Sequence, residues 1–145
     1  MDDLLVIGVE HRIKECKKVT TKFDMKDLGF MHYYLGLEVW HKPSEIYLGQ
    51  GKYVIKILQK FGMVDRKPMM TPMITNLKKL RSLDSNSVDP TFYRQLIGSL
   101  MYLVNTRRNI CFAVFVLIQF HMEPKHDHWI VAKHILIYLH GTLHH

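Results

Sequence analysis

Two adjacent carboxylates, Asp2 and Asp3, stand directly before the apolar run at residues 4–7. Neighbouring carboxylates repel each other, and a divalent cation relieves that repulsion. Mg²⁺ takes oxygen ligands from one or two carboxylates and completes its shell with water and phosphate oxygens. A polar turn at the mouth of a buried strand would present this pair for metal-assisted phosphoryl chemistry. A pair of solvated acids near the N-terminus remains the alternative, because the Asp-Asp motif is short.

The net charge of +7 is concentrated in one part of the sequence. Residues 51–82 contain eight Lys and Arg residues against one acid, Asp65, whereas the flanking segments are close to neutral. A local basic segment favours a polyanionic partner such as a nucleic acid. A solvated helix face followed by a basic loop would give the same pattern, so charge alone leaves both interpretations open.

Composition indicates a globular chain, with 48% hydrophobic and 23% charged residues, long enough for one domain or parts of two. Cys16 and Cys111 lie far apart in apolar stretches without zinc-ligand spacing, so we expect small buried residues in a reducing compartment. Acids directly after Met1 speak against a signal peptide. The longest apolar run, residues 110–118, is much shorter than the roughly 20 residues of a membrane span. We therefore expect an intracellular protein, neither secreted nor membrane-spanning.

The first third of the chain predicts a sheet with one helix. Residues 4–7 are expected to form a strand, and residues 10–23 an amphipathic helix that lies on the sheet. A loop follows at residues 23–29. Aromatic and β-branched residues over 30–40 then predict a strand, which a turn at 42–45 joins to a short strand at 46–48 in an antiparallel hairpin.

The remainder predicts helices. Residues 50–61 form an amphipathic helix that Gly62 ends, with Lys52, Lys56 and Lys60 together on one face. Residues 67–89, rich in Pro, Ser and Asn, are interpreted as a linker and the best candidate for a domain boundary.

Three more helices are expected after the linker. Asp89 caps the first, which begins at Pro90 and runs to about residue 105. Asn109 is expected to cap the second, which runs to residue 119 and is apolar nearly all round, hence central. The third begins at Asp127 and ends at Gly141. The predicted fold class is therefore α+β, with a sheet and helix first and a helical subdomain last.

Histidines and aromatic residues offer further candidates. Seven of the ten histidines follow residue 120, but their spacing does not suit zinc, and we expect His128 and its neighbours to be exposed. There is no nucleophile elbow and no phosphate-binding glycine loop. The aromatic residues of the predicted hairpin belong either to a sheet core or to a surface that contacts nucleic acid.

Taken together, the segments resemble the C-terminal half of the reverse transcriptase domain of copia-type retrotransposons. The matching pieces are MDDLL at 1–5, FDMKDLG at 23–29, YLGLEV at 34–39, QGKY at 50–53, FGM at 61–63, KP at 67–68, TPM at 71–73, YRQLIGSLMYL at 93–103 and YLHGTL at 138–143. Departures occur at residues 106–109, TRRN in place of the family's TRPD, and at His134, Ile137 and His140, where Arg or Lys is usual.

The resemblance implies a partial polymerase palm followed by an α-helical thumb. Residues 1–50 would be the rear of the palm with a primer-grip-like hairpin, residues 51–89 a basic helix and linker, and residues 90–145 the thumb. Asp2 and Asp3 would be catalytic and would bind Mg²⁺. The residues implied to contact an RNA/DNA template–primer are Tyr34, Leu35, Gly36, Lys52, Lys56, Lys60, Arg94, Gln95, Gly98 and Tyr102.

A polymerase of this family also needs fingers, an earlier palm strand with a third aspartate, and a ribonuclease H domain. None of these is found among the matched pieces. We therefore expect the chain to be a truncated part of a Pol polyprotein that is inactive as an RNA-directed DNA polymerase when alone. The alternatives are a non-catalytic nucleic-acid-binding remnant and a degenerate pseudogene product without activity. The oligomeric state stays open.

Overall fold

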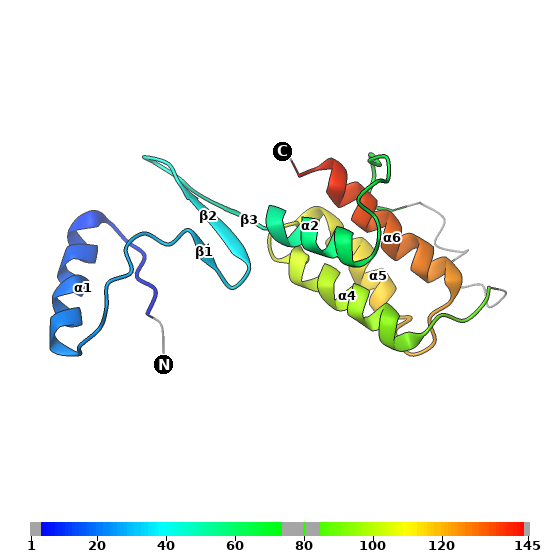
Figure 1. Ribbon diagram of the computed structural model, residues 1–145, viewed down its shortest axis with the longest axis horizontal. Helices are drawn as coiled ribbons and strands as arrows, with labels where there is room; N and C mark the ends of the chain where they lie inside the picture. The colour runs from blue at the N-terminus through cyan, green and yellow to red at the C-terminus, as the bar shows by residue number, and fades with distance from the viewer. Residues whose placement is uncertain (1–3, 74–79, 81–84, 144–145) are drawn as a thin grey trace. The chain divides into compact units, whose positions relative to one another are not determined.

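The computed structural model describes residues 4–73, 80 and 85–143, and its helices and strands are drawn in Figure 1. Asp2 and Asp3 lie outside the described residues. The chain divides into two units, Met1–His32 and Tyr33–His145. Each unit is described by itself.

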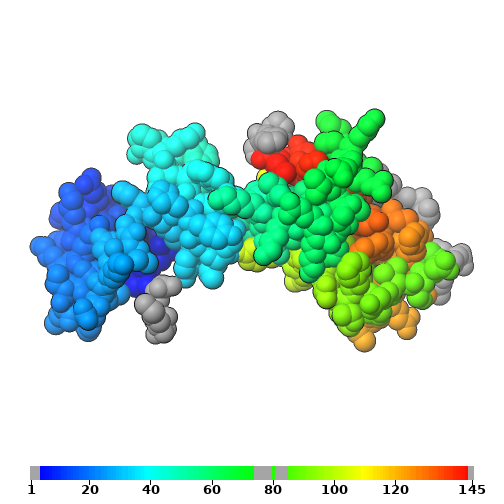
Figure 2. Space-filling view, viewed as in Figure 1, coloured from blue at the N-terminus to red at the C-terminus, as the bar shows by residue number. Residues whose placement is uncertain are grey.

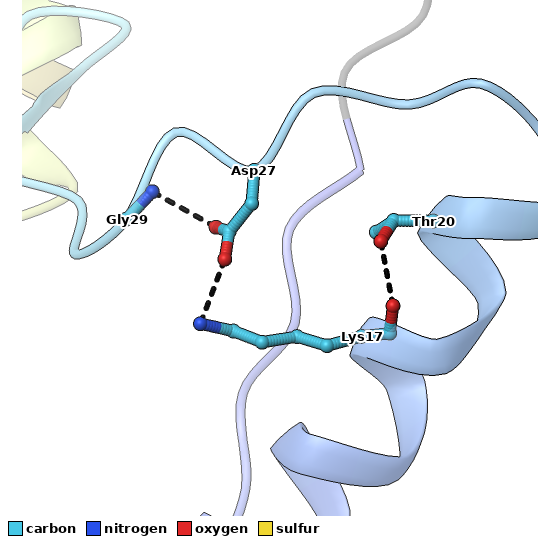
Figure 3. A network of polar contacts seen from close by, with 4 residues as sticks. All are labelled: Lys17, Thr20, Asp27 and Gly29. Carbon is cyan, nitrogen blue, oxygen red and sulfur yellow. Dashed lines mark hydrogen bonds and ion pairs between the residues drawn. The ribbon is translucent and has the colours of Figure 1, made fainter.

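The first unit contains one helix, α1 (Glu10–Lys22), and the loop that follows it. Lys17 Nζ lies 2.8 Å from Asp27 Oδ2, and the Gly29 backbone N–H donates to Asp27 Oδ1 at 2.9 Å, as Figure 3 shows. The hydrogen bond from Lys17 and then that from Gly29 hold the pKa of Asp27 below its ordinary value. The predicted helix and loop are confirmed.

The strand predicted at residues 4–7 is wrong. This segment belongs to no sheet, and its apolar side chains are exposed. A strand needs a neighbour that takes up its backbone hydrogen bonds, and the three strands described here pair only with one another. No residue of α1 is buried, and Cys16 is exposed, so the expectation that Cys16 is a small buried residue is wrong.

The second unit begins with an antiparallel sheet in the order β1-β2-β3. Its strands are β1 (Tyr33–Tyr34), β2 (Leu37–His41) and β3 (Ile46–Gly49). The strand predicted over residues 30–40 is thus two short strands, because Leu35 and Gly36 form a two-residue turn with φ angles of 48° and 81°. Positive φ at both positions is the geometry of a type I′ turn, whose twist suits a hairpin. The turn predicted at 42–45 is confirmed by the bond from Lys42 N to Glu45 O, 2.8 Å.

Four α-helices and one short 3₁₀ helix complete the described part of this unit. They are α2 (Gly51–Lys60), α4 (Pro90–Val104), η1 (Arg108–Ile110), α5 (Cys111–Ile118) and α6 (His126–Gly141). One hydrophobic core contains residues from all of them, and Figure 2 shows α2, in green, packed directly on α6, in orange. Tyr53 and Tyr102 pair at one end of α2, and Phe61 and Phe92 at the other, so α2 and α4 run antiparallel.

Described residues of the predicted linker at 67–89 are attached to this core, so the structure does not divide at them. Leu80 is buried, and Val88 N–H donates to Pro124 O at 3.0 Å. The division in the structure falls between His32 and Tyr33 instead. Residues 74–79 and 81–84 of the predicted linker lie outside the described residues. The assignment of the parts to palm and thumb remains a prediction.

The helix starts were predicted with mixed success. Asp89 caps α4 as expected, since its Oδ1 accepts from Thr91 N–H at 2.8 Å. Asn109 does not cap α5, because its side-chain N–H donates to the Tyr138 hydroxyl at 2.6 Å. The expectation that α5 is central is also wrong, since Phe112 and Phe115 point to solvent with 66% and 56% of their surface exposed.

The expectation that His128 and its neighbours are exposed is wrong for His128. His128 is buried, accepts at Nδ1 from Lys125 N–H (2.9 Å) and lies 2.6 Å from Leu80 O through Nε2. His134 is also buried, with Nε2 2.8 Å from Thr71 O. The two rings therefore attach Leu80 and Thr71 to α6, which is a structural role. Among the described residues, no group of three or more His, Cys, Asp and Glu side chains could hold a metal ion.

No helix in the described part of the chain is both long and apolar enough to span a lipid bilayer.

Candidate nucleic-acid interface

The turn between β1 and β2 lies against α4. A Cβ built on Gly36 would lie 2.6 Å from the Tyr102 hydroxyl oxygen, so the glycine backbone approaches this side chain more closely than any other residue could. Leu35 carries the other positive φ of the turn and its side chain is exposed. Three residues predicted to contact nucleic acid, Leu35, Gly36 and Tyr102, are therefore brought together, with Tyr34 at the end of the adjoining strand.

Glu38 on β2 attaches the sheet to the start of α2. Its carboxylate is buried, accepts from Lys52 N–H at 3.0 Å, and lies 3.7 Å from Lys52 Nζ. The first N–H groups of a helix lack partners within the helix and carry partial positive charge, so a carboxylate is stabilised there. The charge of Lys52 is thus partly neutralised by Glu38.

Gln50 makes a second connection, between the sheet and α4. Its side chain is buried, and its amide N–H donates to Tyr102 O at 3.5 Å while its Oε1 accepts from Thr106 Oγ1 at 2.5 Å. Sequence reasoning missed Gln50 and Glu38 as positioning residues. A charged residue inside a β-prone run, and a polar residue directly before an amphipathic helix, were the available signals.

One face of α4 remains exposed beside this junction. Arg94, Gln95 and Gly98 lie on it, and Tyr102 follows one further turn along. Among the described residues, no atom outside the helix's own backbone lies within 4 Å of a Cβ built on Gly98. A glycine at this position could also allow a second helix to pack closely against α4, but no described helix lies against Gly98.

Lys52, Lys56 and Lys60 recur every fourth residue, so they lie along one side of α2. All three side chains are exposed. Lys60 Nζ lies 5.4 Å from the centre of the Phe61 ring, at the end of α2 that meets Phe92 of α4. The lysines thus begin at the sheet junction and extend along the antiparallel pair of helices.

The predicted metal site cannot be built from the described residues. Its two proposed ligands, Asp2 and Asp3, lie outside them, and the described acids form no cluster of three that could hold Mg²⁺. We therefore derive no catalytic step through a metal ion. The described chemistry is that of a surface with exposed cationic, amide and aromatic groups.

Comparison with known proteins defines the class. The model of the family described as reverse transcriptase (RNA-dependent DNA polymerase) matches residues 1–75, about half of the chain. The chain belongs to this reverse transcriptase family, and the resemblance drawn from its motifs is confirmed.

Similar individual proteins narrow the comparison from the family to transposon polyproteins. Over 147 residues the chain is 35% identical to the retrovirus-related Pol polyprotein from transposon RE2 of Arabidopsis thaliana, covering 98% of the chain and 10% of that polyprotein. The Pol polyprotein from transposon TNT 1-94 of Nicotiana tabacum is 34% identical over 153 residues, covering 98% and 12%. An uncharacterized mitochondrial protein of Arabidopsis thaliana is 36% identical over 147 residues, covering the whole chain and 61% of that protein.

These coverages place the likeness to copia-type transposons across the entire chain, beyond the residues that the family model matches. The chain spans about three-fifths of the mitochondrial protein and about a tenth of the Pol polyproteins. No solved structure matches the chain.

Proposed function

We propose that this chain supplies the template–primer-gripping part of a copia-type reverse transcriptase, with the hairpin as primer grip and the helices as thumb. The observation that carries the proposal is the Leu35–Gly36 turn seated on Tyr102 at the end of the exposed face of α4. This contact joins two elements that sequence resemblance assigned separately to nucleic-acid binding.

The backbone at the turn supports a functional role. A bulky residue such as Leu35 in the left-handed region costs about 1–2 kcal/mol, and its exposed side chain gains little from burial in return. Strain that persists at an exposed position favours a role in binding.

Gly98 supports the same surface. A glycine inside a helix costs about 1 kcal/mol relative to alanine, and no described neighbour requires the missing Cβ. A helix without a Cβ at this point can approach the sugars and phosphates of a duplex closely. Arg94 and the α2 lysines would supply charge for phosphate contacts that do not depend on sequence.

Polymerisation is proposed to need more than this chain. The catalytic carboxylates of the family would be Asp2 and Asp3, and Mg²⁺ would supply the electrostatic stabilisation of phosphoryl transfer. The remainder of a Pol polyprotein would provide the other palm elements. The proposed contribution of the chain itself is to hold and orient the duplex.

Binding of a short RNA–DNA hybrid, followed by fluorescence anisotropy, tests the proposal. Arg94→Glu and Gly98→Leu are expected to weaken binding, the first by lost phosphate contact and the second by blocking close approach. Lys18→Glu on α1 provides a matched control, because it reverses one exposed lysine on a helix with no proposed role. Equal loss in Arg94→Glu and Lys18→Glu would show a nonspecific charge effect, and no loss in either α4 variant would refute the proposed interface.

A further inference from the structure

One face of the hairpin presents three exposed aromatic rings. Residues paired across antiparallel strands point to the same side, and Tyr33 pairs with Glu38 while Trp40 pairs with Tyr47. Since Glu38 and Trp40 are two apart on β2, all four side chains share one face. Tyr33, Trp40 and Tyr47 are 56%, 50% and 44% exposed, so this face is an aromatic surface rather than a sheet core.

The central ring is held in place by a glycine. A Cβ built on Gly49 would lie 2.6 Å from Trp40 Cζ3, so the indole covers the bare backbone of β3. The ring is thereby supported on one side and open to solvent on the other. An aromatic ring fixed in this way is suited to stacking, since little rotamer freedom is left to lose on binding.

Two lysines flank the aromatic surface. Lys42 Nζ lies 4.6 Å from the centre of the Tyr47 ring and Lys52 Nζ lies 5.8 Å from that of Tyr33. The nearby carboxylates are both engaged: Glu45 accepts the Tyr47 hydroxyl hydrogen bond, and Glu38 pairs with Lys52.

Lys52 also begins the row of lysines on α2. The aromatic face of the hairpin therefore adjoins the exposed lysines of α2, which continue from Lys52 through Lys56 to Lys60. An occupant of this face would meet aromatic rings first and then a line of cations.

We propose that Tyr33, Trp40 and Tyr47 form a stacking surface for an unpaired nucleic-acid strand, with Lys42 and Lys52 beside its phosphates. The inference rests on the proposed function and adds a second ligand class to it. Unpaired bases have free faces for stacking on aromatic side chains, whereas the bases of a duplex are already stacked on one another. The basic row that starts at Lys52 favours a polyanion over an apolar protein surface as the occupant.

Trp40 itself can report the contact. The chain has two tryptophans, and Trp129→Phe removes the second while keeping an aromatic ring beside Phe61 and Phe92. In this background, a short single-stranded oligodeoxythymidylate is expected to quench Trp40 fluorescence. An abasic strand of the same length and charge should quench much less, because it retains the phosphates but has no bases to stack. Equal quenching by both strands would overturn the proposal.

Substitutions separate this site from the duplex site. Trp40→Ala is expected to weaken single-strand binding roughly tenfold, because it removes the ring on which a base would stack. Ile46→Ala is the matched control, because Ile46 is exposed on the opposite face of the same hairpin and should leave binding unchanged. Hybrid binding should change less than about twofold in both variants.

The remaining outcomes are also decisive. If the chain binds the hybrid but no single strand, this inference fails while the proposed function stands; if it binds neither, the proposed function fails with it. Self-association that Trp40→Ala abolishes, in the absence of nucleic acid, would show that the face binds a second copy of the chain and would overturn the proposal.

Discussion

Gly36 and Gly98 lack a Cβ for different physical reasons. Gly36 has a φ of 81° and lies against the Tyr102 hydroxyl, so both its backbone conformation and its surroundings favour glycine. Gly98 has ordinary helical geometry in α4 and open space where a Cβ would project. The folded chain therefore requires the first glycine, while the second lowers stability and calls for an explanation outside the fold.

Alanine substitutions at the two glycines should change stability in opposite directions. Gly36→Ala is expected to lower the free energy of unfolding by about 1–2 kcal/mol, because alanine is strained at positive φ and its methyl displaces Tyr102. Gly98→Ala should raise it by up to about 1 kcal/mol through helix propensity alone. Urea denaturation measures both. A destabilising Gly98→Ala would mean that the fold itself needs this glycine.

Tyr93 is fully buried, and its hydroxyl donates to Leu117 O at 2.8 Å, which links α4 to α5. Burial raises the pKa of Tyr93 well above its ordinary value. The folded state therefore favours the neutral phenol, and this contribution to stability is complete below the unfolded-state pKa of about 10. It is lost as the pH rises above that value toward the folded-state pKa.

Tyr93→Phe isolates this effect. The variant should lose about 0.5–1.5 kcal/mol at neutral pH through the missing hydrogen bond, and its stability should decline less than that of the wild type above about pH 10. Urea denaturation at neutral and alkaline pH measures both quantities. Parallel pH profiles for the two proteins would contradict the role assigned to the buried phenol.

At the scale of elements, the loop after α1 is fixed by one carboxylate. Asp27 pairs with Lys17 and accepts from Gly29 N–H, so its pKa is lowered from an ordinary value of 3.8. A lowered pKa means that these contacts support the loop above pH 3.8 and are lost as the pH falls through the folded-state value.

An NMR titration of the Asp27 carboxyl group and the Gly29 amide checks this loop. The midpoint should lie below 3.8 in the wild type. It should move up in Lys17→Met, which removes the main cause of the shift, and stay unchanged in Lys18→Met, whose side chain belongs to the same helix. A Lys17→Met midpoint equal to that of the wild type would show that the lysine does not act on Asp27.

Local patterns predicted the helices better than the strands. The helices α2, α4 and α6 could be predicted from local sequence signals. These signals are apolar residues at helical spacing, the Asp89-Pro90 start and the glycines at 62 and 141. Residues 4–7 have a strong β propensity. A strand, however, also depends on a neighbouring strand to pair with, and propensity does not predict whether one is present. The Leu35-Gly36 turn was missed because Leu rarely occupies a type I′ position.

At the level of the whole molecule, the family resemblance identified the candidate binding residues but did not predict which of them lie in contact. Resemblance gave Leu35, Gly36 and Tyr102 as candidates, whereas their contact depends on the buried side chains of Gln50 and Glu38, which no local pattern identifies as connectors. The same limit explains the misplaced boundary. Pro and Ser content suggested a linker at 67–89, whereas Leu80 within it is buried and its carbonyl oxygen lies beside the buried ring of His128.

We expect the chain alone to show no polymerase activity. The proposed role of the chain is to hold a duplex. Metal-dependent phosphoryl transfer by a polymerase also requires a complete set of metal-binding carboxylates. A primer-extension assay with Mg²⁺ or Mn²⁺ on an RNA template measures this. Template-dependent product that disappears in Asp2→Asn and Asp3→Asn would contradict the expectation and assign full catalysis to the chain.

The affinity of the wild-type chain for an RNA–DNA hybrid, measured over a range of salt concentrations, shows whether the proposed surface holds nucleic acid. We predict measurable binding at low salt that weakens as salt rises, with a log–log slope of roughly −2 to −4 for a few phosphate contacts. Lys56→Glu should make the slope shallower by about one. No binding at low salt, or a slope near zero, would contradict the claim that this surface holds nucleic acid.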